Sequence, residues 1–163
     1  MAHRVFNALQ SVTTTVLISA NRSLSDYQKL APGHVYCDPP ELQGQGPLVG
    51  LLTGMKQAAR LGAKAILVSP CDTPDLSPDL LFELVNAWRQ APEKPVIAQC
   101  GDRVHPLHGV YPVTLVPLLQ RQLAAANRRV MAAVADAGAI TLPFGAVACK
   151  TLRNRNRWED LQD

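Results

Sequence analysis

Apolar positions along the chain follow two spacings, and together they predict strands and helices in alternation. Short apolar runs or alternations typical of strands lie at 14–20, 35–36, 65–68, 95–100, 140–144 and 147–152. Apolar residues three and four positions apart, typical of helices, lie at 3–10, 48–61, 78–90, 113–125 and 129–137. Such alternation predicts a single α/β domain over residues 1–163, with a mainly parallel sheet and helices on both faces.

A carboxylate follows the strand predicted at 65–68. That strand is a continuous apolar run, which favours a parallel strand covered on both faces. The next helix is well signalled, because Ser77, Pro78 and Asp79 suit its N-cap, its first position and its first turn. Asp72 therefore lies at the carboxyl end of a strand, the edge where open α/β sheets bind ligands. The alternative interpretation is that Asp72 caps a turn.

Composition excludes some classes of protein and leaves others open. The chain has 163 residues, of which 47% are hydrophobic and 18% charged, with a formal net charge of +3. Many of its arginines lie in the last third of the sequence, after residue 120. They suit a phosphorylated partner or a solvated helix face equally well. Aromatic residues make up only 5% of the chain, too few for a platform that stacks single-stranded nucleic acid. The apolar runs are too short to span a membrane.

The cysteines and histidines show no metal-binding spacing. Cys37, Cys71, Cys100 and Cys149 are scattered, which predicts no disulfide framework. With no signal-peptide pattern at the start, the sequence indicates a reducing cytoplasm. We expect Cys71 to be a small packed thiol rather than a nucleophile. His105 and His108 are expected to pack or hydrogen-bond, without a catalytic role.

A set of motifs resembles one family over essentially the whole chain. In order, they are "SANRS", "CDPP", "GQGPLVGLLTGM", "SPCDTPDLSPDLL", "HPLHGVYP", "NRRVMAAV" and "RNRNRWEDL". Their order and rough spacing resemble those of the molybdenum cofactor guanylyltransferases, the MobA type. The resemblance implies a Rossmann-like three-layer nucleotidyltransferase fold. It also implies Mg²⁺-dependent transfer of GMP from GTP to the phosphate of molybdopterin, with release of pyrophosphate.

The resemblance implies a nucleotide site around Asp72. Asp72 matches the family's catalytic carboxylate, which holds Mg²⁺ against the phosphates of the nucleotide, as transfer at a phosphoryl centre requires. Asp38 resembles the acid that contacts the guanine nucleotide, and Asn21 lies in the corresponding asparagine-bearing loop. Ser19 stands where the family commonly has asparagine, so a hydroxyl replaces a side-chain amide.

The resemblance also implies an acceptor site for molybdopterin. Its candidate residues are Gly46, Arg128, Arg129, Asn154 and Asn156. Arginine forks match phosphate geometry, and glycine allows a ligand to approach the backbone closely. Each residue type also has a structural alternative. The glycine could simply allow a turn in the loop, the arginines could lie on a solvated helix face, and the asparagines could cap a helix or form a turn. GTP and molybdopterin are the implied ligands, other molybdenum cofactor maturation proteins are candidate partners, and neither nucleic acid nor membrane is expected.

One part of the family pattern has no counterpart in the sequence. The family opens with a strand, a glycine-rich phosphate-binding loop with an Arg-Met-Gly signature, and a lysine, so we expect the first strand and phosphate loop to be absent here. Three hypotheses therefore stay open. The domain is a guanylyltransferase, a non-catalytic module that binds a pterin or a partner, or a cytidylyltransferase of the same fold. The C-D-T-P motif favours guanine by resemblance.

Overall fold

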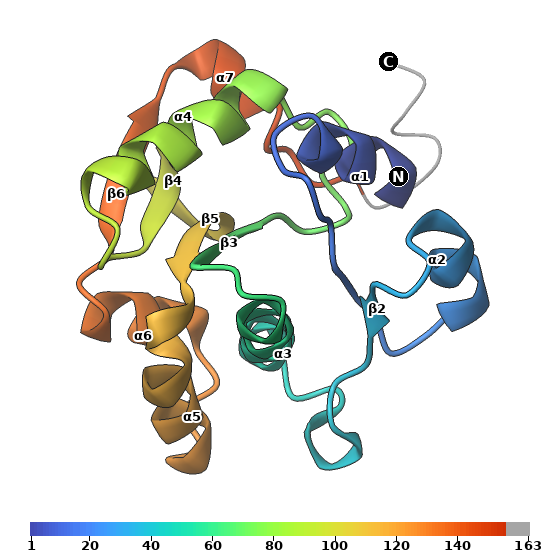
Figure 1. Cartoon of the computed structure of the whole chain (residues 1–163). Helices are drawn as coiled ribbons and strands as arrows, with labels where there is room; N and C mark the ends of the chain where they lie inside the picture. The colour runs from blue at the N-terminus through green and yellow to red at the C-terminus, as the bar shows by residue number, and fades with distance from the viewer. Residues whose placement is uncertain (156–163) are drawn as a thin grey trace.

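The computed structural model of the chain describes residues 1–155. The helices are α1 (Ala2–Gln10), α2 (Leu24–Leu30), α3 (Pro47–Arg60), α4 (Pro78–Gln90), α5 (Val116–Ala124), α6 (Val130–Asp136) and α7 (Ala146–Lys150), with short 3-10 helices η1 (Pro40–Leu42) and η2 (Val113–Leu115). The strands are β1 (Ile18–Ser19), β2 (Val35–Tyr36), β3 (Ala65–Val68), β4 (Val96–Cys100), β5 (Arg103–Pro112) and β6 (Ile140–Phe144). Strands and helices alternate along most of this order, as predicted (Figure 1). None of the helices within residues 1–155 is long and apolar enough to cross a membrane.

The strands form two separate sheets. The larger sheet has the order β3-β5-β4-β6, and the smaller one pairs β1 with β2 in parallel. In the larger sheet β4 is parallel to β6, whereas β5 is antiparallel to both β3 and β4. It follows that β3, β4 and β6 run in one direction and β5 alone is reversed.

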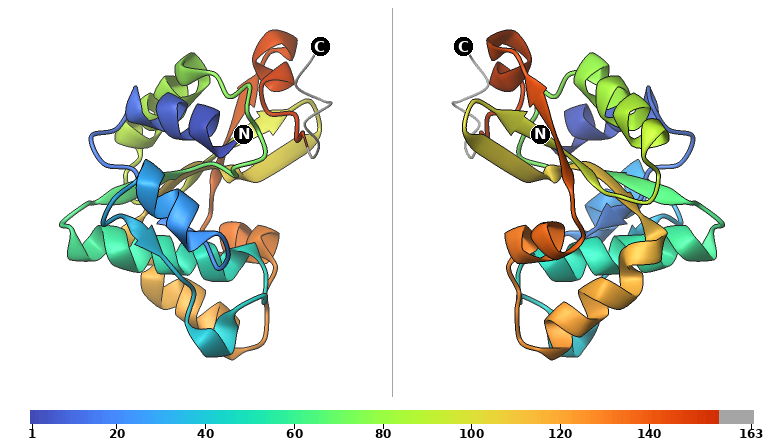
Figure 2. Two further views of the ribbon diagram at one scale, coloured as in Figure 1. Left: turned by 90° about the vertical axis from the view of Figure 1, so that its right-hand side faces the viewer. Right: turned by 90° about the vertical axis from the view of Figure 1, so that its left-hand side faces the viewer.

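Helices cover both faces of the larger sheet, which confirms the Rossmann-like three-layer fold (Figures 1 and 2). Successive residues of β4 point to opposite faces, as the pleat of a strand requires. Val96 and Ala98 pack in a core with apolar side chains of α1 and α4. Ile97 packs in a second core with side chains of α3, α5 and α6.

Local signals explain where α3 begins and ends. Gly46 precedes the helix with a φ of +99°, a conformation that glycine adopts far more easily than other residues, and Pro47 occupies the first helical position. Gly62, with a φ of +78°, follows the end of the helix, where a left-handed glycine commonly ends one.

Three sequence predictions were wrong about strands. The strand expected at 14–20 is reduced to Ile18–Ser19, and the segment expected as a strand at 147–152 forms helix α7. Alanines and the N-cap Gly145 favour that helix over a strand. The sequence also missed β5, in which prolines and glycine weaken the strand pattern. Gly109 of β5 fits because β4 is so close there: an added Cβ would lie 2.5 Å from the carbonyl oxygen of Val96.

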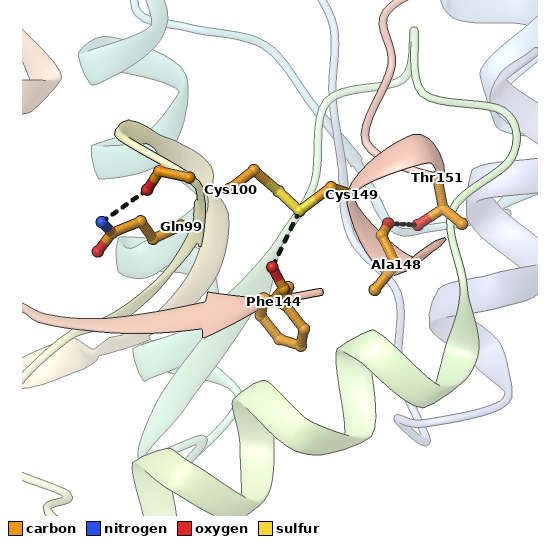
Figure 3. Close-up of a disulfide and its surroundings, with 7 residues drawn as sticks. Gln99, Cys100, Phe144, Ala148, Cys149 and Thr151 are labelled. Atoms are coloured by element: carbon orange, nitrogen blue, oxygen red, sulfur yellow. Dashed lines mark hydrogen bonds between the residues drawn. A yellow bond between two sulfur atoms is a disulfide. The ribbon is translucent and has the colours of Figure 1, made fainter. Parts of the chain in front are cut away.

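The prediction of no disulfide was also wrong. Cys100 ends β4, Cys149 lies in α7, and the two are bonded with their Cα atoms 5.7 Å apart (Figure 3). Their separation of 49 positions gave no signal, because the sheet creates the proximity: Cys100 is in register with Phe144 at the end of β6, directly before α7. Cys37 and Cys71 are free and exposed, so the expectation of a packed Cys71 was wrong too.

Candidate functional site

A cavity of about 730 Å³ separates the two sheets, lying between β1 and β3. Its lining is mostly apolar and includes Ser19, Gly50, Ile66 and Asp72. Within residues 1–155, β1 pairs only with β2 and β3 only with β5, so each strand presents one unpaired edge. All four residues of β3 are only half-buried, and its one partner is antiparallel. The prediction of a parallel strand covered on both faces was therefore wrong for this strand.

Asp72 lies on the loop that follows β3, as the sequence predicted. The side-chain amide of Asn154 donates a hydrogen bond of 2.6 Å to its Oδ2. The backbone N–H of Arg155 donates to the carbonyl oxygen of Asp72 at 2.8 Å. Asn154 and Arg155, the last two described residues, thus hold the carboxylate and the backbone of Asp72.

A buried polar network stabilises the same loop on the side that faces the protein interior. Thr73 is 1% exposed and donates its hydroxyl to the carbonyl oxygen of Pro70 at 3.1 Å. His108 Nε2 lies 3.3 Å from the same hydroxyl oxygen, and because the Thr73 proton is already used, the ring donates there. Burial, with a smaller effect of His105, lowers the pKa of His108 to about 4, so the ring is neutral at pH 7. The expected hydrogen-bonding role of His108 is confirmed.

Asn21 and Asp38 form a reciprocal pair. The Asn21 amide donates to Asp38 Oδ2 at 2.7 Å, and the Asp38 backbone N–H donates to Asn21 Oδ1 at 2.9 Å. Thr53 of α3 donates to the other carboxylate oxygen at 3.0 Å. The pair joins the segments that follow β1 and β2 and anchors both to α3. Of the three residues predicted to contact the nucleotide beside Asp72, Ser19 lines the cavity between β1 and β3. Asn21 and Asp38 are not in the lining of that cavity.

The predicted acceptor residues fall into separate groups. Arg128 Nε donates to Gln45 Oε1 at 3.0 Å, which brings this arginine to the loop of Gly46 across 83 positions of sequence. Arg129 precedes α6 as its N-cap, and the side chains of both arginines are exposed. Asn154 lies instead on Asp72, and Asn156 is outside the described residues.

The donors around Asp72 fit one kind of metal site. Within residues 1–155, no cluster of three or more His, Cys, Asp or Glu side chains could hold a metal ion alone. Mg²⁺ is commonly bound through one or two carboxylates together with substrate phosphates, and such a site needs no protein cage. Asn154 uses only one of the two carboxylate oxygens of Asp72. The residues therefore fit Mg²⁺ that arrives with a nucleotide.

The loop also carries a thiol and an acid, Asp75, whose ion pairs sequence reasoning missed. Partial burial of the sulfur atom, and then the charge of Asp72, raise the pKa of the Cys71 thiol, which disfavours the thiolate needed for a nucleophile. Asp75 pairs with Arg155 and Arg4. No local signal marks the Asp75–Arg155 pair, because its members come from distant parts of the chain.

Comparison with known proteins agrees with the fold and with the sequence motifs. The family model of the MobA-like NTP transferase domain matches residues 1–139. A molybdenum cofactor guanylyltransferase of Pasteurella multocida (strain Pm70) is 32% identical over 160 residues, which cover 97% of this chain and 80% of that protein. One from Cereibacter sphaeroides is 40% identical over 100 residues, which cover 61% of this chain and 50% of that protein. The chain thus spans about half the length of several curated relatives.

Solved structures show the same architecture. A protein from Aquifex aeolicus VF5 matches with a TM-score of 0.82 at 23% identity, covering 96% of this chain and 78% of that one. Molybdopterin-guanine dinucleotide biosynthesis protein A from Archaeoglobus fulgidus matches with a TM-score of 0.72 at 15% identity, covering 97% and 82%. At these identities the structures establish the fold, and the family follows from the sequence matches. The chain belongs to the family of MobA-like NTP transferase domains.

Proposed function

We propose that this domain transfers GMP from GTP to the phosphate of molybdopterin. The observation that carries the proposal is the placement of Asp72: it follows β3, lines the cavity that Ser19 also lines, and is held by Asn154. The names of the sequence relatives support the same reaction. Three of the motifs that resemble the family contribute Ser19, Gly50 and Asp72 to the lining of this cavity, and another carries Asn154.

The reaction displaces pyrophosphate at the α-phosphorus of GTP. An oxygen of the molybdopterin phosphate attacks, the new phosphorus–oxygen bond forms, and the bond to the bridging oxygen of the β-phosphate breaks. Such a step asks mainly for positioning and charge neutralisation. Bound Mg²⁺ supplies neutralisation of the phosphate charge. Asp72 would hold the ion through a carboxylate oxygen, and the Asn154 hydrogen bond keeps that carboxylate in one orientation.

The remaining residues divide between the two substrates. Ser19, Asn21 and Asp38 would form the nucleotide side of the site, with the buried Asp38 held in place by Asn21 and Thr53. Gly46, Arg128 and Arg129 would face the acceptor, whose phosphate suits arginine forks. Gln45 supports this division because it holds Arg128 beside the Gly46 loop. We place the reaction in the cytoplasm, with molybdenum cofactor maturation proteins as partners.

Binding measurements separate this function from its two rivals. Mg²⁺-dependent binding of GTP, measured by calorimetry together with binding of molybdopterin, supports the guanylyltransferase. Molybdopterin binding without any nucleotide binding supports the non-catalytic module. Tighter binding of CTP than of GTP supports the cytidylyltransferase. An Asp72→Asn variant is the control, because its loss of Mg²⁺-dependent binding assigns the signal to this site.

A further inference from the structure

We propose that Asp75 and Arg155 form a latch that positions Asp72. The inference rests on the proposed role of Asp72 as the metal-holding carboxylate. Neither Asp75 nor Arg155 is placed among the groups that touch the substrate, so both are positioning residues. The latch joins the loop after β3 to the segment after α7, two parts of the chain about eighty positions apart.

Arg155 holds the loop at two points. Its backbone N–H donates to the carbonyl oxygen of Asp72, and its Nε donates to Asp75 Oδ2, each at 2.8 Å. The two acceptors lie three residues apart on the loop, so the contacts fix both the position and the direction of the incoming segment. Asn154 is the residue directly before Arg155, and its side chain consequently reaches Asp72 Oδ2.

The ion pair joins two oppositely charged side chains that are both half-buried. Leu152, 4% exposed, packs in the core with α1 and α4, but Arg153 and Asn154 beyond it are exposed. A hydrogen bond between an exposed amide and a carboxylate competes with water, and its net strength is modest. The Asp75–Arg155 contact is charge-assisted, and its side chains are only 33% and 27% exposed. It therefore limits how often Asn154 leaves Asp72.

The rest of the loop is held independently of the latch. Thr73 and Leu76 are buried, and Thr73 contacts His108 and Pro70 underneath. Loss of the latch should therefore release Asn154 and Arg155 without unfolding the loop. That separation distinguishes a positioning role from a purely structural one.

Asp75 has a second cationic neighbour, which the experiment must separate. Arg4 Nη1 of α1 lies 3.8 Å from Asp75 Oδ1, and the Arg4 side chain is 59% exposed. At that distance and exposure the pair contributes little. An Arg4→Gln variant tests whether an effect of changing Asp75 passes through α1 instead of through Arg155.

The test uses the full 163-residue chain and two readouts. Residue-resolved hydrogen exchange follows the backbone amide of residue 155, and calorimetry follows Mg²⁺-dependent GTP binding. Asp75→Asn and Arg155→Gln should each speed that exchange and weaken that binding by about three- to fivefold, with an unchanged thermal midpoint. Asp75→Glu should keep most of the wild-type behaviour. The double variant Asp75→Asn/Arg155→Gln should be no worse than either single one, since both remove the same contact.

Matched controls carry the same changes of charge nearby. Asp79→Asn in the first turn of α4 and Arg153→Gln, two positions before Arg155, should leave both readouts at wild-type values. The proposal is overturned if the exchange at residue 155 does not respond to Asp75→Asn. It is also overturned if Asp79→Asn or Arg4→Gln reproduces the effect, or if exchange responds while GTP affinity does not. A wild-type chain that binds no Mg²⁺–GTP contradicts the proposed function instead, and the exchange measurement still decides whether the latch exists.

Discussion

The side-chain amide of Asn154 donates a 2.6 Å hydrogen bond to Oδ2 of Asp72, although 82 positions separate the two residues. The bond orients a carboxylate that lines the cavity between β1 and β3. It also links the C-terminal part of the described chain to the loop after β3. The chemistry proposed for the domain depends on this carboxylate more than on any other group.

Replacing Asp72 with asparagine should abolish the metal dependence of nucleotide binding. The variant keeps the shape of the side chain but loses its charge, so a hard cation loses its anionic ligand. We expect Mg²⁺-dependent GTP affinity to fall about tenfold or more, the same result that chelation of Mg²⁺ with EDTA gives for the wild type. Thermal unfolding should be unchanged. Near-normal Mg²⁺-dependent binding by the variant would refute the metal role of Asp72.

Replacing both Arg128 and Arg129 with alanine should weaken binding of molybdopterin and spare GTP. The variant loses charge-assisted contacts to the acceptor phosphate, and a loss of about tenfold is expected. The remaining binding should also depend less on salt concentration. Titrations at low and high salt measure both effects, with the exposed Arg121 of α5 changed to alanine as a control. Unchanged molybdopterin affinity would mean that the two arginines belong to a solvated surface and do not bind the acceptor.

His108 should make the folded protein less stable as the pH falls from about 6.5 to 4. Burial lowers the pKa of His108 from 6.5 to about 4, so between these values the unfolded chain binds a proton that the folded chain does not. The free energy of unfolding then rises with pH across this window and the gain is complete above it, at about 3 kcal/mol for this residue. Urea denaturation at several pH values measures the slope. A His108→Gln variant should lose this part of the pH dependence; equal slopes in the two proteins would contradict the assignment.

Reduction of the Cys100–Cys149 disulfide should destabilise the domain. The bond closes a loop across 49 positions, and the chain-entropy model gives about 4 kcal/mol for a loop of that size. Urea denaturation with and without a phosphine reductant measures the change. A Cys100→Ala/Cys149→Ala variant should not respond to the reductant, whereas a Cys37→Ser/Cys71→Ser variant should respond like the wild type. A wild-type midpoint that ignores the reductant would show that the bond does not form in solution.

Local signals in the sequence predicted much of the framework but few of the contacts. Gly46, Pro47 and Gly62 mark the ends of α3 through conformations that depend on neighbouring residues alone. The position of Asp72 was equally predictable, because a short apolar run and a helix start bracket it. In contrast, β5 contains residues that weaken a strand pattern, and only its pairing with β3 and β4 stabilises it.

The contacts of the candidate site depend on the fold. Asn154 was a candidate from the resemblance, but its contact with Asp72 requires β6 and α7 to return the chain to the loop after β3. The Asp75–Arg155 and Cys100–Cys149 pairs depend in the same way on neighbouring strands and the segments that follow them. Periodicity and capping carry no information on such pairs, since both arise within a few residues. The roles proposed for Ser19, Asn21 and Asp38 stay predictions.

The cavity between β1 and β3 suggests how full activity could be obtained. Both strands present an unpaired edge to it within the described residues, and unpaired backbone groups beside apolar walls are costly. Ala2, the first residue of α1, lines the same cavity as Asp72. A strand added ahead of Met1 could therefore run between the two sheets and reach the site.

We predict that the 163-residue chain alone shows no measurable GMP transfer, and that an added strand, glycine-rich loop and lysine from a related enzyme restore it. Each preorganised donor to developing charge contributes about a hundred- to a thousandfold in rate, and the added segment supplies several. Release of pyrophosphate in the presence of molybdopterin, GTP and Mg²⁺ compares the two proteins. A third protein, with the added strand but alanine in place of the lysine and loop glycines, should gain thermal stability without gaining full turnover. Robust turnover by the short chain would show that the triphosphate is held by residues already present. The backbone amides around Gly46 and Cys71 would then be the candidate phosphate-binding groups.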